Sequence, residues 1–452
     1  MPRKFIYIAI IFIAICLCLS LAIRDSLRPT HDKVVVCYVA SWAQYRPGKG
    51  EFKFDDFKPN HCTHVIYSFA GLNVTTSTIR SLDPWADFED DYGKGMYKKV
   101  TGLRRLYPHL KVSLAIGGWN EGSANYSALA ASPQRRSTFI SSVVLFLKNN
   151  NFDGLDLDWE FPGKRGGTPY DKVNFISLIK ELRESMRQYN FLLTAAISAD
   201  KKTIDIAYDI SEISMYLDFI HVMAYDYHGS WDTYVAPNAP LKCNDELCVE
   251  SSINYLLKLN APPEKLVLGL AMYGRTFILT SKLNNTESPI GRPCLNRGFQ
   301  GNYTREDGFM GYNEICKELV QSPQNWRVGA DKDNNYIWAV HDDKVVVYDN
   351  LITIAEKVKY AKKVNLAGVM IWSIDTDDFT GECANLHSDI LDPLTGLDYP
   401  LVRAINIAFT KTSPSNDMEN QLQSDKSSAI LYFIDIWIIK ICFILSIQTI
   451  MY

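Results

Sequence analysis

FDGLDLDWEFPG, residues 152–163, contains four carboxylates in a stretch that otherwise has the apolar pattern of a buried strand. Side chains on a strand alternate between its two faces, so three of the acids share one face and three large apolar residues share the other. The two sets are Asp156, Asp158 and Glu160, and Leu155, Leu157 and Trp159. The pattern predicts a strand whose apolar face packs against helices and whose acidic face points into a barrel.

Apolar runs of the same kind recur along the chain. Eight runs are rich in β-branched residues, and amphipathic stretches such as 139–150 and 173–188 separate them. The runs are KVVVCYV (33–39), THVIYSFA (63–70), KVSLAIGG (111–118), FDGLDLDWE (152–160), LLTAAISA (192–199), DFIHVMAYD (218–226), KLVLGLAMYG (265–274) and LAGVMIWSI (366–374). This alternation is typical of parallel β/α units rather than hairpins. The sequence therefore predicts an α/β fold, a closed (β/α)8 TIM barrel, over 33–410.

The connection between the seventh and eighth strands is too long for a single helix. It contains Gly/Asn-rich turns, a helix-like stretch at 312–321 and strand-like runs at 336–342 and 344–349. We expect a small α+β insertion domain at 278–360. Such an insertion would form one wall of a groove at the mouth of the barrel.

Hydrophobic segments stand at both ends of the sequence. Residues 1–22 have a basic start, an apolar stretch and small residues suited to cleavage, which predicts a signal peptide; an uncleaved anchor is the alternative. A polar linker is expected at 411–428, and a hydrophobic tail, a candidate membrane anchor, at 429–452. We expect a secreted, extracellular protein, or alternatively a membrane-anchored one with its barrel outside the cell.

The charge composition indicates which kind of substrate or partner to expect. The net charge of -4 is mild and spread along the chain, so no basic face predicts nucleic-acid binding, and a neutral substrate is expected. We expect the protein to act as a monomer.

The cysteines fit an oxidising compartment. Outside the two terminal segments seven remain, an odd number, so at least one lacks a partner within the domain. Four sequons also fit an exported protein: Asn73, Asn125, Asn284 and Asn302. His61 and His64 flank Cys62, which raises a metal site as the alternative to a disulfide cysteine beside surface histidines.

The acidic row predicts a catalytic site. Neighbours two apart on a strand lie about 6.6 Å apart at Cα, and two charges there repel by roughly 2–3 kcal/mol, which raises one pKa by up to about two units. Glu160 comes last in the row, where barrel enzymes place catalytic groups. A protonated acid beside an ionised one is what glycosidic cleavage requires. The alternative, a calcium loop, would place a glycine among its ligands, whereas Gly154 precedes the row.

Six blocks of this sequence carry a resemblance to a known family. They are SWAQYRPG (41–48), LAIGGWN (114–120), FDGLDLDWEFPG (152–163), MAYDYHGSW (223–231), GLAMYGRTF (269–277) and GVMIWSIDTDDF (368–379). With them the chain resembles the family 18 glycoside hydrolases, the chitinases and chitinase-like lectins, and most closely the animal, arthropod-like chitinases. The resemblance runs from about Val34 to Phe409 and implies a (β/α)8 barrel with an insertion after the seventh strand.

The resemblance also implies a reaction, an endo-acting, retaining and substrate-assisted hydrolysis of chitin or chito-oligosaccharides. Glu160 would be the acid and then the base, and Asp158 would turn toward the N-acetyl group of the sugar. Asp156 would hold and tune Asp158, Tyr225 would hydrogen-bond the N-acetyl oxygen, and Asp153, on the opposite face, would be structural. No metal or organic cofactor is implied.

Further residues are implied in binding and in disulfides. The substrate-binding set is Tyr38, Trp42, Phe69, Trp119, Met223, Asp226, Tyr273, Arg275 and Trp372. The implied bridges are Cys37–Cys62 and Cys316–Cys383. Cys243 and Cys248 depart from the family pattern and could close a small ring or pair with Cys294. Two other functions remain open: a glycan-binding chitinase-like lectin with little turnover, and a membrane-displayed signalling protein whose glycan cleavage is incidental.

Overall fold

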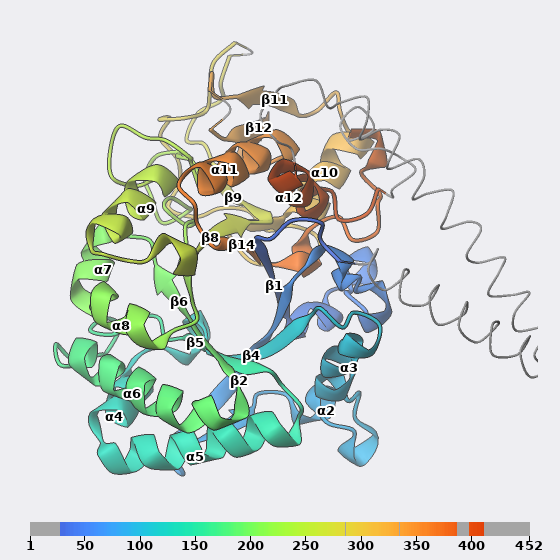
Figure 1. Cartoon of the computed structure of the whole chain (residues 1–452). Helices are drawn as coiled ribbons and strands as arrows, with labels where there is room; N and C mark the ends of the chain where they lie inside the picture. The colour runs from blue at the N-terminus through green and yellow to red at the C-terminus, as the bar shows by residue number, and fades with distance from the viewer. Residues whose placement is uncertain (1–27, 285, 334, 387–396, 411–452) are drawn as a thin grey trace, which may run out of the picture.

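Eight parallel strands form a closed ring in the computed structural model, which describes residues 28–284, 286–333, 335–386 and 397–410. The ring closes because β1 pairs with β14 on one side and with β2 on the other. Figure 1 looks into this ring, with helices α3 to α9 around its outside. The barrel strands are β1 (Val34–Ala40), β2 (His64–Asn73), β4 (Lys111–Gly117), β5 (Gly154–Asp158), β6 (Leu192–Ser198), β7 (Phe219–Met223), β8 (Leu266–Ala271) and β14 (Gly368–Trp372). The predicted (β/α)8 barrel is confirmed, and each of the eight predicted runs overlaps one barrel strand; the run 265–274 also includes the first residues of the next strand, β9 (Tyr273–Ile278).

The barrel strands are buried on both faces, as parallel strands covered by helices are. On β1, Val35, Cys37 and Val39 pack outward into the core between strands and helices, while Val36 and Tyr38 pack inside the barrel. Full burial of an aliphatic side chain such as Val35 contributes about 1.5–3 kcal/mol. The alternation that the sequence predicted therefore produces two apolar layers, one outside the ring and one within it.

Several outer helices begin at residues that cap them. Ser132 accepts a hydrogen bond from the N–H of Arg135 at the start of α5, and Asp200 and Asp209 accept equivalent bonds at α7 and α8. The helices around the barrel are α2 (Pro84–Asp87), α3 (Met96–Gly102), α4 (Ala124–Ala131), α5 (Pro133–Asn149), α6 (Asp171–Met186), α7 (Lys201–Ala207), α8 (Ile210–Tyr216), α9 (Val249–Lys258), α11 (Leu351–Lys363) and α12 (Pro400–Thr410). A short strand, β3 (Thr78–Ser81), adds antiparallel to β2.

A second sheet lies between β8 and β14, as expected for an insertion. Its order is β10-β9-β13-β12-β11, all antiparallel, and α10 (Tyr312–Gln321) accompanies it. The strands are β9 (Tyr273–Ile278), β10 (Phe309–Gly311), β11 (Arg327–Ala330), β12 (Ile337–His341) and β13 (Lys344–Tyr348). The sheet thus begins at Tyr273, before the expected range 278–360, and ends before α11, which packs against β14 and α12. Because β9 follows β8 directly, its first residues lie close to the barrel mouth.

The expected terminal segments, 1–22, 411–428 and 429–452, lie outside the described residues. Within the part of the chain that the structure describes, no helix has both the length and the apolar character needed to cross a bilayer. The signal peptide, the linker and the membrane-anchored alternative therefore stay predictions.

Three disulfides join cysteines of the described residues: Cys37–Cys62, Cys243–Cys248 and Cys316–Cys383. The first and third are the pairs that the resemblance implied. Cys243 and Cys248 close the small ring, which leaves Cys294 buried and unpaired.

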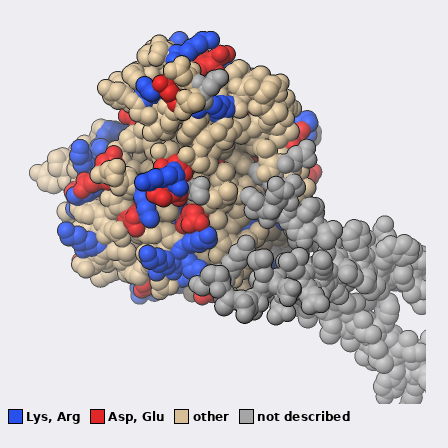
Figure 2. All heavy atoms as spheres, turned by 90° about the horizontal axis from the view of Figure 1, so that it is seen from above, with Lys and Arg blue, Asp and Glu red and all other residues tan. Residues whose placement is uncertain are grey.

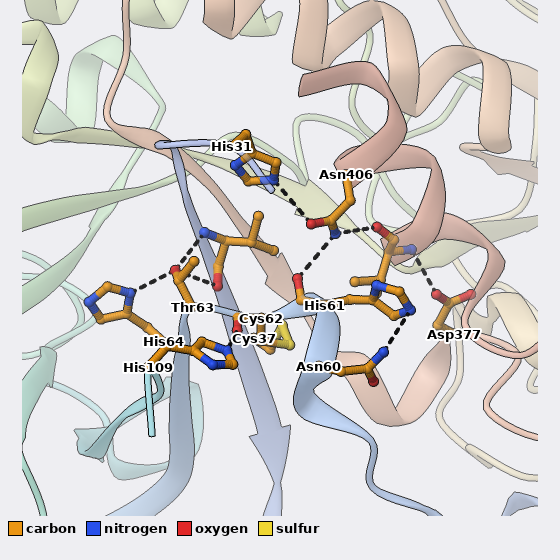
Figure 3. Close-up of a disulfide and its surroundings, with 12 residues drawn as sticks. His31, Cys37, Asn60, His61, Cys62, Thr63, His64, His109, Asp377 and Asn406 are labelled. Atoms are coloured by element: carbon orange, nitrogen blue, oxygen red, sulfur yellow. Dashed lines mark hydrogen bonds between the residues drawn. A yellow bond between two sulfur atoms is a disulfide. The ribbon is translucent and has the colours of Figure 1, made fainter. Parts of the chain in front are cut away.

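The surroundings of Cys62 argue against the metal alternative. Its sulfur is bonded to Cys37, so it offers no thiolate, and the two neighbouring histidines bond to other side chains (Figure 3). His61 contacts Asn60, and His64 contacts Thr63. Burial lowers the pKa of His61 to about 3 and that of His64 to about 4, so both rings are neutral at physiological pH.

Candidate active site

The acidic row lies on β5 and just beyond its end. Leu155, Leu157 and Trp159 pack into the outer core. Asp156 and Asp158, which alternate with them, are buried, and Glu160 is partly exposed after the end of the strand. The carboxylates are therefore at the C-terminal end of a barrel strand, where the loops of a TIM barrel build their sites.

Asp156 is held by three side chains from other strands. Its Oδ2 accepts from Tyr38 Oη at 2.8 Å, and its Oδ1 accepts from Thr194 Oγ1 at 2.6 Å. His221 Nδ1 lies 3.1 Å from Oδ1 and 2.8 Å from Tyr38 Oη. All four side chains are buried, so the bonds are shielded from water and fix the position of the Asp156 carboxylate.

Asp158, unlike Asp156, is not held by hydrogen bonds from described residues to both of its carboxyl oxygens. It is buried, and its Oδ1 has no hydrogen-bond partner among the described residues. Burial first, and then the charges of Glu160 and Asp156, raise the pKa of Asp158 well above its usual value. The structure therefore presents a buried carboxyl group with an unused polar atom, which is unusual in a folded protein.

Two glycines allow the next loop to approach Asp158. The N–H of Gly118 donates to the Asp158 carbonyl at 2.8 Å, and both Gly117 and Gly118 have positive φ, 113° and 84°. A Cβ on Gly117 would lie 2.2 Å from that carbonyl oxygen, and one on Gly118 would lie 2.8 Å from the Phe69 ring. Only glycine fits these positions without displacing the backbone of the site.

Glu160 has a pKa raised to about 7. The largest cause is burial; the charge of Asp226 adds to it, and that of Arg165 opposes it. The sequence predicted a raised pKa in this row but attributed it to repulsion along the strand. The structure instead assigns the increase at Glu160 first to burial and then to the carboxylate of Asp226, in the loop after β7.

Tyr225 and Asp226 follow β7 at the same end of the barrel. Burial and the nearby carboxylates raise the pKa of Tyr225 well above its usual value, so it remains a phenol that can donate. Among the described residues, the hydrogen bond found for its hydroxyl is the weak one to Met370 Sδ, at 3.9 Å. Its donor is therefore available to a ligand.

The insertion contributes two side chains to this site. Arg275 binds Asp226 through two bonds, Nε to Oδ1 at 2.8 Å and Nη2 to Oδ2 at 2.7 Å, and Tyr273 Oη donates to Oδ1 at 2.6 Å. The Tyr273 ring also packs edge-on against Tyr225 and stacks on Phe309. Bidentate arginine–carboxylate pairs have a defined geometry, so Asp226 is held firmly toward the barrel mouth.

Aromatic side chains form a continuous group beside the acids. The Phe69 ring stacks on Trp372 (5.7 Å between centroids, 27°) and on Trp42 (6.1 Å, 18°). Trp42 is 44% exposed, and Met223 lines the barrel interior beneath. Trp119, which is 58% exposed, lies outside this stack, on the loop after β4.

Some residues that support the acids are not among those predicted from the sequence. His221 could have been found, because it occupies alternate positions along the chain with Met223 and Tyr225, and Thr194 is one of two polar residues in the apolar run 192–199. Arg165 has no comparable signal. Asp153, expected to be structural, binds Arg104 Nη1 at 2.6 Å and the N–H of Val112 at 2.8 Å, away from the other acids.

Comparison with known proteins agrees with this arrangement. The family model described as glycosyl hydrolases family 18 matches residues 34–377. "Probable chitinase 2" of Drosophila melanogaster is 50% identical over 427 residues, which cover 90% of this chain and 86% of that protein.

Solved structures share the fold. The Group IV chitinase of Ostrinia furnacalis in complex with allosamidin has a TM-score of 0.76 and 40% identity, covering 83% of this chain and 98% of that one. Human YKL-39, described as a pseudo-chitinase with retained chitooligosaccharide binding, has a TM-score of 0.73 and 32% identity, covering 84% of this chain and all of that one (100%).

Proposed function

The chain belongs to glycosyl hydrolase family 18, and we propose that it is a chitinase. It hydrolyses β-1,4 bonds between N-acetylglucosamine units within the polymer, by a retaining mechanism in which the substrate's own N-acetyl group takes part. Chitin and chito-oligosaccharides are its substrates.

One observation carries this proposal. Asp158 is buried beside Glu160, and its Oδ1 has no hydrogen-bond partner in the part of the chain that the structure describes, while Glu160 has a pKa raised to about 7. A sugar whose N-acetyl group entered this space would supply the missing partner, because an amide N–H is a donor and Asp158 can accept. Glu160 would remain protonated near neutral pH and could supply a proton to the leaving oxygen.

The proposed reaction has two steps. In the first, Glu160 protonates the glycosidic oxygen as the N-acetyl carbonyl oxygen attacks the anomeric carbon, and Asp158 accepts the amide N–H as that nitrogen gains positive charge. In the second, the Glu160 carboxylate takes a proton from water as the water attacks the same carbon and expels the carbonyl oxygen. Two displacements at one carbon retain its configuration.

The neighbouring residues have matching roles in the proposal. Tyr225 would donate to the N-acetyl oxygen and so position it for attack. Trp42 and Trp372 offer apolar faces on which pyranose rings can stack, with Phe69 packed between them. A neutral polysaccharide also suits the surface, where cationic and anionic side chains are interspersed on the face shown in Figure 2.

The lectin alternative is less favoured. A binding protein needs no proton donor, yet Glu160 lies just beyond the end of β5 with its pKa raised to about 7, where it can donate a proton near neutral pH. We also propose that the protein acts outside the cell, since three disulfides in a chain of this kind favour an oxidising compartment. Of the four sequons, Asn125, Asn284 and Asn302 are exposed and Asn73 is half-buried, so we propose them as glycosylation sites.

The experiment compares the purified protein with Glu160→Gln on fluorogenic chitobioside and chitotrioside. Loss of the proton donor should lower kcat by about 10²–10⁴-fold. Glu184→Gln, on the exposed face of α6, is the matched control and should leave kcat unchanged. Equal turnover by wild type and Glu160→Gln would remove Glu160 from the mechanism. The anomer released at early times, followed by NMR, tests the second half of the proposal, because an α product would contradict retention.

A further inference from the structure

Arg165 joins two loops of the proposed active site. It lies in the loop after β5, and its guanidinium carbon stands 3.5 Å from the centroid of the Trp119 ring. Its Nη1 donates to the carbonyl oxygens of Trp119, at 2.9 Å, and of Glu160, at 3.0 Å. One side chain therefore contacts both the exposed indole after β4 and the main chain of the proton donor.

The stacking geometry leaves one face of the indole available. At 3.5 Å the guanidinium lies directly over the ring, so that face of Trp119 is covered. The side chain as a whole is still 58% exposed, so the opposite face is open to a ligand. A planar guanidinium can stack and donate in its own plane at the same time, which an ammonium group cannot do.

The backbone of the loop supports a specific requirement for this side chain. Arg165 has a φ of 51°, in the left-handed region that costs energy for a residue with a Cβ. Glycines with positive φ stand nearby at Gly163 and Gly166, and glycine would adopt the conformation of position 165 at lower cost. The contacts of the arginine with Trp119 and Glu160 offset this cost.

We propose that Arg165 is a positioning residue for the hydrolysis. It covers one face of the Trp119 ring, so that a sugar ring can stack on the other face. It also fixes the position of the Glu160 main chain relative to Trp119. The inference rests on the proposed function and adds to it a residue that acts through two others without touching the reacting atoms.

The charge of Arg165 gives a second, separable effect. Among the described residues, five ionisable groups act on Glu160 or are acted on by it: Asp158 at the end of β5, Asp226 and Tyr225 after β7, Tyr208 after α7, and Arg165. Of these five, only Arg165 is cationic, and it lowers the pKa of Glu160 against burial and Asp226. Positioning and charge can therefore be tested with two different substitutions.

The experiment uses Arg165→Lys and Arg165→Gln in the full chain. Lys keeps the positive charge but loses the planar group that stacks on Trp119 and hydrogen-bonds two carbonyl oxygens, so KM for chitotetraose and longer substrates should rise about two- to fivefold. The basic limb of the pH profile of kcat/KM should stay in place. Gln also loses the charge, so the same rise in KM should come with a basic limb moved up by roughly half a pH unit. Arg105→Gln is the matched control, because it removes an exposed arginine from η6 (Leu103–Arg105), which precedes β4 at the other end of the barrel.

The outcomes separate the two proposals. A wild-type protein that does not hydrolyse chito-oligosaccharides would overturn the proposed function itself. With an active wild type, variants whose KM and basic limb both match the wild type would overturn the role of Arg165. A general loss of kcat with lowered thermal stability, an unmoved limb and unchanged KM would also overturn it, because that result describes a structural residue only.

Discussion

Tyr38 donates its hydroxyl to Oδ2 of Asp156 at 2.8 Å across the interior of the barrel, from β1 to β5. These two strands do not pair with each other in the ring, so the bond connects separate parts of its wall. Asp156 is thereby fixed, whereas the side chain of Asp158, next on the same face, has an oxygen that no described residue hydrogen-bonds. A fixed acid adjacent to an unsatisfied one is the arrangement expected where one carboxyl group must move and the other must not.

We predict that Tyr38→Phe lowers kcat about tenfold with little change in KM. The substitution keeps the ring but removes one of the donors that hold Asp156, so the carboxyl group next to Asp158 is less firmly placed. The free energy of unfolding should fall by about 1 kcal/mol, the net value of one hydrogen bond. Tyr67→Phe is the control: Tyr67 is equally buried and donates to Asp87 at 2.8 Å, but outside the barrel. Its kcat should be unchanged, and an equal loss in both variants would contradict the prediction.

Much of the fold could be predicted from the sequence because the barrel strands are short and apolar, and amphipathic stretches separate them. Parallel strands covered on both faces need continuous apolar runs, and those runs are visible without any alignment. The start of the second sheet was less visible. β9 follows β8 after Met272 alone, so the apolar pattern of 265–274 predicts one strand although the run contains the end of one sheet and the start of another.

The pH dependence of activity should show the state of Glu160. It must be protonated to act as an acid, so kcat/KM should be retained below its pKa and fall as pH rises through about 7. Asp226→Asn removes a negative charge that raises this pKa, so the basic limb should move to lower pH. Measuring kcat/KM from about pH 4 to 9 tests both statements, and a flat profile to about pH 9 would contradict the first.

The same group should make the folded protein less stable at alkaline pH. The pKa of Glu160 is raised from 4.5 to about 7, so folding favours its protonated form. Below pH 4.5 Glu160 is protonated in both the folded and the unfolded state, so it does not affect the free energy of unfolding. Above about pH 7 it is ionised in both states, and its burial as a charged group lowers the stability of the folded state. At pH 8 the free energy of unfolding of Glu160→Gln, measured by denaturant titration, should therefore exceed that of the wild type by about 1–3 kcal/mol. Near pH 4 the two proteins should be equally stable. Glu184→Gln should show no such dependence on pH.

The exposed indole of Trp42 should matter more for long substrates than for short ones. Its ring is 44% exposed at the edge of the stack that ends at Trp372, so Trp42→Ala removes apolar area that a sugar ring could cover. A loss of about 1–2 kcal/mol would raise KM for chitotetraose and longer oligosaccharides roughly five- to thirtyfold, with little effect on chitobiosides. Tyr92→Ala, at a fully exposed tyrosine of η5 (Asp90–Tyr92), is the control. An equal change for every substrate length would contradict the prediction.

The candidate site was predictable where residue type and strand period coincide, and not elsewhere. Asp156, Asp158 and Glu160 stand out because acids are rare in an apolar strand. Arg165 could not be found in this way, since its role depends on a loop folding back over Trp119, and one arginine among glycines carries no periodic signal. The cause of the raised pKa of Glu160 was likewise beyond the sequence, because burial is its largest part and Asp226, its second cause, lies in the loop after β7, far from Glu160 in the chain.

The three disulfides should contribute unequally to stability, in the order of the loops they close. Cys316–Cys383 spans 67 residues and Cys243–Cys248 spans 5. Loop-closure entropy then predicts a loss of about 4 kcal/mol for the first and about 2 kcal/mol for the second when each pair is replaced by alanine. Cys316 and Cys383 are also buried, so their removal leaves small cavities that increase the difference. Urea denaturation of the two double variants measures this order, and Cys294→Ala serves as the control for replacing a cysteine that forms no disulfide with a described residue. A larger loss of stability from the Cys243–Cys248 variant would contradict the prediction. It would show that this bridge stabilises the native loop before α9 rather than restricting the unfolded chain.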